Sequence, residues 1–296
     1  QCLYGATVSE RIRLQVLLLF ALSEEKVGVT HETAEVISLE SRRAAQRKSE
    51  IVLVTRIAST GSKPFLGTAS DGHDYWCKPP NNSQGEETVI AEVAAGVIGD
   101  LIGAPIPTWT TLPISPDLRG LFIREAGYRL DGRDVFASRV IHDADIAVMD
   151  HGSLEHVTDD GNYNRIPKLF ALWFLCNAED IQFAYNPADD YSVTSIDHGF
   201  WFGSHEYPWG FGSPTELHGR PRVPTVRTPI PPKHWDKAIE TLDLLDDGLA
   251  GRIRDKLPEN WAVDKLLVEK IASYVLSRKD YAQTELIQLK KTKGGR

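Results

Sequence analysis

Cysteine is scarce in this chain, and an excess of basic charge is missing. The three cysteines, Cys2, Cys77 and Cys176, are too few and too widely spaced for a disulfide framework or a zinc site. A reducing cytoplasm is therefore the expected compartment. The 33 Lys and Arg residues are outnumbered by 41 Asp and Glu residues, which gives a net charge of −8. No basic face follows from this balance, so nucleic acid is not expected as a partner.

Long hydrophobic runs are missing too. The apolar stretch at residues 14–22 is too short to span a bilayer, and no small-residue cleavage site follows it. We therefore expect no membrane partner and no secretory signal. The sequence also lacks the G-x-x-x-x-G-K-[ST] phosphate loop and the G-x-S-x-G nucleophile motif, which argues against a P-loop nucleotide site and a hydrolase triad.

The first half of the chain predicts a helical extension followed by a small β-rich unit. Residues 1–50 are expected to be helical, and β-prone runs begin at Ile51. The Asp71-Gly72 pair joins two such runs, which is a hairpin signal, and Pro79 ends the second run. Further strands are expected at 109–112 and 121–124. Residues 51–125 should therefore form one unit.

One long helix is expected inside this unit, at residues 86–102. Its apolar side chains form two adjacent rows of four-residue spacing, which predicts a wide buried face. The rows are Val89, Val93, Val97 and Leu101, and Ile90, Ala94, Ile98 and Ile102. Gly103 ends the helix.

Residues 126–290 are expected to form a mainly helical unit. Helices are predicted at 135–149, 167–177, 233–245, 249–256 and 263–276, with one strand at 191–196. The basic tail at 291–296 is expected to be disordered. The predicted fold class is α+β, with a β-rich part around one long helix and a mainly helical part.

Two residues of the first unit are candidates for phosphate binding. Lys78 ends a strand just before the long helix, where its ammonium group can reach a phosphate as a point charge. Glu92 lies among apolar neighbours on the helix, and a buried acid usually has a partner, for which Lys78 is available. A solvated strand-end lysine and a rim carboxylate are the plainer interpretations.

Three residues of the second unit are candidates for metal binding and catalysis. Asp197 follows the predicted strand and precedes Gly199, a setting that suits Mg²⁺ as well as an ordinary turn. The polar segment before that strand contains Asp180, which can accept a proton, and Asn186, which can hold a second metal ion. A polar turn is the alternative for this segment.

The order of these residues resembles that of the HipA-like kinases, in particular compact actinobacterial-type members. The likeness lies in the lysine strand at 71–80, the glutamate helix and proline turn at 91–107, the segment Ser195-Ile196-Asp197-His198-Gly199-Phe200, and a late turn at 257–261. It covers roughly residues 51–285. The resemblance implies a two-lobed protein-kinase-like fold, with lobes at 51–125 and 126–290.

The resemblance further implies phosphoryl transfer from ATP with Mg²⁺ to a hydroxyl group of a protein or small molecule. Lys78 and Glu92 would then serve the nucleotide, Asp197 and Asn186 the metal, and Asp180 the acceptor hydroxyl. Such kinases occur in toxin–antitoxin systems, so an antitoxin or regulatory partner is implied as well.

Three departures from the kinase pattern keep a second function open. No Gly-rich phosphate loop is evident before Lys78. Five residues separate Asp180 from Asn186, where a kinase catalytic loop has four. Trp76 shares a strand face with Lys78, where it either stacks on the adenine base or fills its place. An active kinase and a pseudokinase that binds a nucleotide or partner without transfer therefore both remain open, beside a purely structural role.

Overall fold

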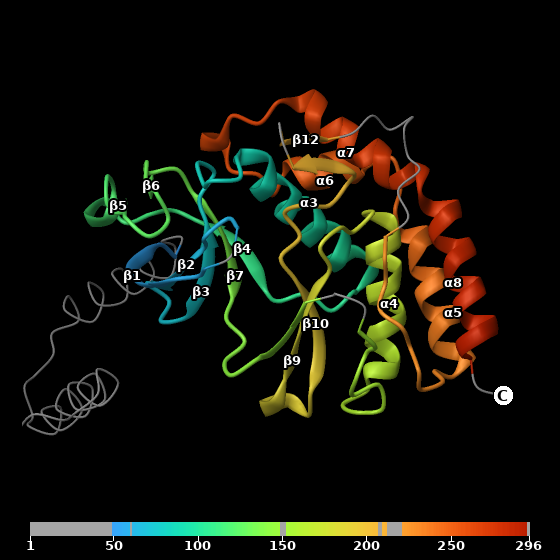
Figure 1. Cartoon of the computed structure of the whole chain (residues 1–296). Helices are drawn as coiled ribbons and strands as arrows, with labels where there is room; N and C mark the ends of the chain where they lie inside the picture. The colour runs from blue at the N-terminus through green and yellow to red at the C-terminus, as the bar shows by residue number, and fades with distance from the viewer. Residues whose placement is uncertain (1–48, 60, 149–151, 207–208, 212–220, 295–296) are drawn as a thin grey trace, which may run out of the picture. The chain divides into compact units, whose positions relative to one another are not determined.

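The computed structural model describes residues 49–59, 61–148, 152–206, 209–211 and 221–294. It divides the chain into two units, Gln1–Lys48 and Ser49–Arg296. The helical extension expected at residues 1–50 lies almost wholly outside the described residues. All elements named below belong to the second unit (Figure 1).

A five-stranded antiparallel sheet forms the N-terminal part of this unit. Its strands run in the order β1-β2-β3-β7-β4, so the chain returns to the sheet after the long helix. They are β1 (Ile51–Ile57), β2 (Phe65–Ala69), β3 (Asp74–Lys78), β4 (Trp109–Leu112) and β7 (Val135–Arg139). The predicted hairpin joins β2 to β3, and Gly72 takes the positive φ of 81° that its turn requires.

Side chains alternate across β3, as the two-residue period of a strand demands. Tyr75 and Cys77 point into a small core on one face of the sheet. Trp76 and Lys78 consequently share the opposite face.

Helix α3 (Glu86–Ile102) has the bounds that the sequence predicts. It begins after Gly85 and ends at Gly103, whose left-handed φ of 63° caps the last turn. Every residue from Thr88 to Gly99 is buried, because α3 contacts β7 as well as α4, α5 and α6. A polar side chain in this stretch therefore needs a protein partner.

A second sheet and a group of helices form the C-terminal part. The sheet has the order β10-β9-β8 and comprises β8 (Asp145–Val148), β9 (Gln182–Asn186) and β10 (Ser192–Ile196). Residues 140–144 connect β7 of the first sheet to β8 of the second. The helices are α4 (Asn162–Leu175), α5 (Pro232–Thr241), α6 (Leu249–Arg254), α7 (Lys265–Ser277) and α8 (Lys279–Lys293), and α4, α5 and α8 pack together.

Short elements complete the described part. They are the pairs β5 (Phe122–Ile123) with β6 (Tyr128–Arg129) and β11 (Ser204–Glu206) with β12 (Trp209–Phe211), and single turns of 3-10 helix at Pro116–Leu118, Pro187–Asp189, Leu242–Leu244 and Glu259–Trp261. The helices of this part are all too short or too polar to cross a bilayer.

The predicted α+β class is confirmed, but two local predictions are wrong. The sequence predicts a helix at 135–149, but residues 135–148 form β7, a connection and β8. Val135, Phe136 and Ala137 are all buried, and a short buried apolar run looks the same in a strand and in a helix. The tail is not disordered throughout, since α8 continues to Lys293.

Candidate functional site

Lys78 and Glu92 form a buried ion pair between the sheet and α3. The Nζ atom of Lys78 lies 2.5 Å from Oε1 of Glu92. The side chains are 8% and 2% exposed, respectively, so water screens the pair little. The order of strand lysine and helix glutamate in the sequence thus becomes a direct contact.

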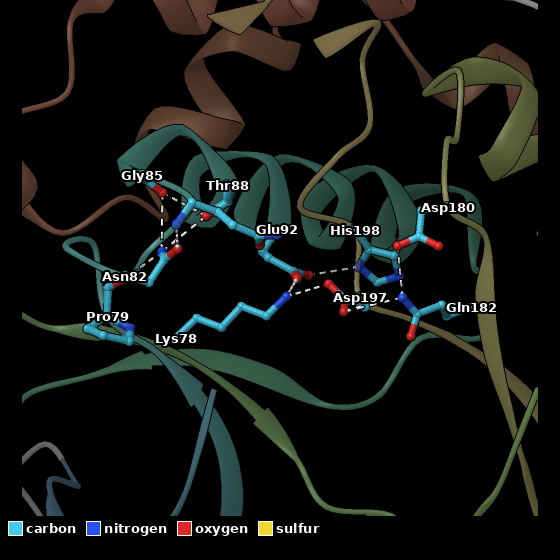
Figure 2. A network of polar contacts seen from close by, with 11 residues as sticks. Lys78, Pro79, Asn82, Gly85, Thr88, Glu92, Asp180, Gln182, Asp197 and His198 are labelled. Carbon is cyan, nitrogen blue, oxygen red and sulfur yellow. Dashed lines mark hydrogen bonds and ion pairs between the residues drawn. The ribbon is translucent and has the colours of Figure 1, made fainter. Parts of the chain in front are cut away.

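The turn between β3 and α3 holds these two elements in register. Asn82 is buried there, and its amide donates hydrogen bonds to the carbonyl of Pro79 at 2.9 Å and to the hydroxyl of Thr88 at 3.1 Å. One side chain therefore ties the end of the lysine strand to the first turn of the glutamate helix (Figure 2).

Asp197 brings the C-terminal part to the same lysine. It follows β10 and has a left-handed φ of 57°, and its Oδ1 atom lies 2.5 Å from Nζ of Lys78. Its side chain is 27% exposed, so it keeps access to solvent. Figure 2 shows Lys78 reaching out between Glu92 and Asp197.

This arrangement determines the charge state of the buried pair. Burial alone would lower the pKa of Lys78, but the carboxylates of Asp197 and Glu92 outweigh it and raise that pKa above its ordinary value. Burial alone would raise the pKa of Glu92, but Lys78 and His198 hold it well below its ordinary value. Both side chains are therefore charged at neutral pH.

Gln182 is a site residue that the sequence did not predict. It is the first residue of β9 and pairs with Ile196, the neighbour of Asp197. Its Nε2 atom lies 3.4 Å from Oδ2 of Asp197 and 3.1 Å from Oδ2 of Asp180. The strand pairing that carries Gln182 to this place is a long-range contact, which the polar character of the segment does not indicate.

The structure separates Asp180 and Asn186, which the sequence placed in one loop. Asp180 is exposed and reaches Asp197 only through Gln182. Asn186 ends β9 and pairs with Ser192, four residues along the strand from Gln182. At about 3.3 Å per residue this is roughly 13 Å, too far for Asn186 and Asp197 to share a metal ion. The Oδ1 atom of Asn186 instead accepts a hydrogen bond from the backbone N–H of Ala188 at 3.1 Å.

In a kinase catalytic loop the catalytic Asp stands five positions before the metal-binding Asn. If Gln182 takes the place of that Asn, the position of the catalytic Asp is occupied by Asn177, an amide. Asn177 is buried, has a φ of 47°, and its side chain is hydrogen-bonded to Tyr274. The acid nearest to Gln182 in this loop is Asp180, two residues before it.

A cavity of about 260 Å³ opens beside these residues. Its polar end contains Lys78, Glu92, Asp197, His198 and Gln182. Its other walls are mostly apolar and include Trp76, Ile106, Trp109, Phe136, Ile146 and Ala184. Trp76 thus faces the cavity as predicted from its strand face, whereas Asp180 and Asn186 are not among the lining residues.

The donor set fits a divalent cation that is bound together with a phosphate. Mg²⁺ is usually held by one or two carboxylates plus substrate oxygens rather than by a complete protein cage. Asp197 supplies one carboxylate. The Gln182 amide lies beside it with Nε2 toward the carboxylate, and a 180° turn of this amide would present its oxygen instead. The described ranges contain no cluster of three or more His, Cys, Asp or Glu side chains that could hold a metal alone.

A kinase family model matches part of this chain. The family model described as HipA-like kinase matches residues 51–170, which confirms the resemblance over the lysine strand, the glutamate helix and part of the C-terminal half. This match and the two-part α+β architecture confirm the predicted kinase-like fold. No curated protein matches the chain.

Solved structures of kinases are also similar to this chain. The crystal structure of the Helicobacter pylori proinflammatory kinase CtkA matches with 12% identity and a TM-score of 0.49, over 81% of this chain and 98% of that one. A structure of the Golgi casein kinase matches with 11% identity and a TM-score of 0.47, over 87% of this chain and 78% of that one. A second structure of the Golgi casein kinase, with Mn and ADP bound, has 11% identity and a TM-score of 0.47, over 99% and 92% of the two chains.

Proposed function

We propose that this protein binds ATP with Mg²⁺ in the cavity and transfers the terminal phosphoryl group to a hydroxyl acceptor. The observation that carries the proposal is the contact of Lys78 with both Glu92 and Asp197 at the polar end of the cavity. Glu92 holds the ammonium group in place, so that Lys78 is directed to the phosphates. The apolar walls, with the Trp76 ring, suit an adenine base.

The metal would be held by Asp197 and Gln182 rather than by Asp197 and Asn186. When bound, Mg²⁺ would neutralise the charge of the phosphate oxygens. Asp180 would accept the proton of the acceptor hydroxyl. The hydroxyl oxygen would bond to the terminal phosphorus of ATP, and the bond between that phosphorus and ADP would break. The acceptor hydroxyl would belong to a protein or a small molecule. The HipA-like resemblance also supports an antitoxin or other regulatory partner.

A second candidate function is nucleotide binding without transfer. Asn177, the amide five residues before Gln182, favours it, because an amide cannot take up the proton. In this case the protein would be a pseudokinase whose nucleotide regulates binding of a partner.

Incubation with ATP labelled at the terminal phosphate separates the two functions. We expect labelled protein or labelled acceptor in a lysate with the wild type, and none with Asp197→Asn. Asp180→Asn should bind ATP as the wild type does but lose transfer. If the wild type binds ATP and labels nothing, the pseudokinase function is the correct one.

A further inference from the structure

His198 follows Asp197 directly and is buried against α3. It is 4% exposed, and its Nδ1 atom lies 3.1 Å from Oε2 of Glu92. Oε1, the other oxygen of the same carboxylate, is the one that contacts Lys78. Glu92 therefore lies between Lys78 of the first sheet and His198 of the C-terminal part (Figure 2).

The surroundings of His198 leave this contact as its main polar interaction. The ring packs against Trp201, with ring centroids 4.4 Å apart. Among the described residues its Nε2 atom has no hydrogen-bond partner, and its Nδ1 atom lies within hydrogen-bonding distance of Oε2 without meeting the full geometry of a hydrogen bond. Both the Nδ1-protonated neutral ring and the imidazolium can donate from this atom.

Glu92 needs such a donor for a physical reason. A buried carboxylate is stable only if its oxygens are satisfied, and a lone Lys78 contact leaves Oε2 without a partner. A carboxylate held at both oxygens cannot swing away from the lysine. The phenylalanine of the Asp-Phe-Gly element of protein kinases has no donor and cannot provide this contact.

We infer that His198 is a positioning residue that fixes the Glu92 carboxylate for Lys78. Because Asp197 and His198 are adjacent, one backbone segment then serves both the candidate metal site and the lysine–glutamate pair. The effect of this role on ATP affinity rests on the proposed function. The alternative is that His198 only fills space beside Trp201, in which case any aromatic ring would serve.

The test measures the reactivity of Lys78 in the protein without nucleotide. Acetic anhydride acylates lysines, and mass spectrometry of the digest gives the rate at Lys78, with the exposed Lys265 as internal reference. His198→Asn keeps an N–H near the position of Nδ1, whereas His198→Phe keeps a ring and loses the donor. We expect acylation of Lys78 to become about tenfold faster in His198→Phe, as for loss of a hydrogen bond to a charged group. His198→Asn should stay within about threefold of the wild type.

A second background shows whether His198 acts through Glu92. In Glu92→Gln the further change to His198→Phe should leave the acylation rate unaltered. Equal rates in His198→Phe and His198→Asn, or the same increase in both backgrounds, would overturn the inference. If His198→Phe does not fold by circular dichroism, His198→Gln replaces it, because the longer side chain carries its amide past the Nδ1 position.

The affinity for ATP and Mg²⁺ is measured on the same variants. It should fall about tenfold in His198→Phe and recover in His198→Asn. If the wild type binds no ATP while the acylation rates behave as expected, the proposed function fails and the positioning role stands. If the wild type binds ATP and the acylation rates do not differ between the variants, the positioning role fails and the proposed function stands.

Discussion

The ammonium nitrogen of Lys78 lies 2.5 Å from a carboxylate oxygen of Asp197, a residue 119 positions further along the chain. The same nitrogen lies 2.5 Å from Glu92 on α3. One buried cation thus joins β3, α3 and the segment after β10. The candidate site exists only where the sheet and the C-terminal part pack together, so its integrity and the stability of the fold depend on the same contacts.

Loss of the lysine should destabilise the protein strongly. Lys78→Met leaves Glu92 buried without its cation, and breaking a buried ion pair from one side costs about 3–5 kcal/mol. We expect the free energy of unfolding in urea to fall by this amount. Lys265→Met removes a lysine that is 70% exposed and should change it by less than about 0.5 kcal/mol.

A double variant separates the buried charge from the lost packing. Lys78→Met combined with Glu92→Leu removes both partners, and apolar replacements of a buried pair are often neutral. The double variant should therefore recover most of the stability that Lys78→Met loses. A loss that persists in full would show that the uncompensated Glu92 charge is not its cause.

The pair should also affect stability in acid. The pKa of Glu92 is lowered in the folded protein, so its contribution is complete above its ordinary pKa of 4.5 and is lost as the pH falls further. Below that value the free energy of unfolding of the wild type should fall by about 1.4 kcal/mol more per pH unit than that of Glu92→Gln. Urea unfolding of both proteins at pH 7, 4 and 3 measures the difference. Equal slopes would mean that Glu92 does not titrate as the ion pair requires.

Alkaline pH acts on the other partner. The pKa of Lys78 is raised in the folded protein, so its contribution is complete below its ordinary pKa of 10.5 and is lost only as the pH rises beyond it. The pair is therefore at full strength throughout the neutral range.

A glycine of α3 positions one wall of the cavity. The ring of Trp109 packs so closely on Gly96 that a Cβ atom there would collide with it, and Trp109 lines the cavity. Gly96→Ala should cost about 1–3 kcal/mol of unfolding free energy through overpacking and should weaken ATP binding as the ring moves.

The matched control for this substitution is Gly251→Ala in α6. A Cβ atom at Gly251 meets no atom within 4 Å, so the change should stabilise the protein by about 0.5–1 kcal/mol through helix propensity. ATP affinity should remain unchanged. Similar losses of stability in both variants would contradict the packing argument.

Two amides of β9 distinguish the alternative metal sites. Gln182 lies beside Asp197, whereas Asn186 lies at the other end of the strand. Gln182→Ala should reduce the Mg²⁺-dependent part of ATP affinity about tenfold, in the range found when metal-supporting residues are replaced. Asn186→Ala should leave it unchanged. Calorimetric titrations with and without Mg²⁺ measure both, and the opposite pattern would restore Asn186 as the ligand.

The sequence predicts the first half of the site better than the second. Helix α3 follows from its two apolar rows, and the Lys78 strand follows from its hairpin signal, because both patterns are local. Gln182 and Asn186 were not distinguishable in this way. Their separation of about 13 Å exists only because β9 pairs with β8 and β10, and such pairing depends on residues remote in the sequence.

The contact of His198 with Glu92 had no signal in the sequence either. Its position beside Asp197 was visible, but which way its ring turns depends on how the segment after β10 packs on α3. The wrong helix at 135–149 has the same origin. Its apolar residues are buried because β7 lies between β3 and β4, and the order of the strands is not written in any local period.

The most direct test of the central claim is calorimetric titration of ATP into the wild type and Asp197→Asn, each with Mg²⁺ and with EDTA. We predict that the wild type binds ATP with Mg²⁺ and at least about tenfold more weakly with EDTA, as loss of a phosphate-bridging cation implies. Asp197→Asn should bind equally weakly in both. The account is contradicted if the wild type does not bind ATP, or if Asp197→Asn retains the full response to Mg²⁺.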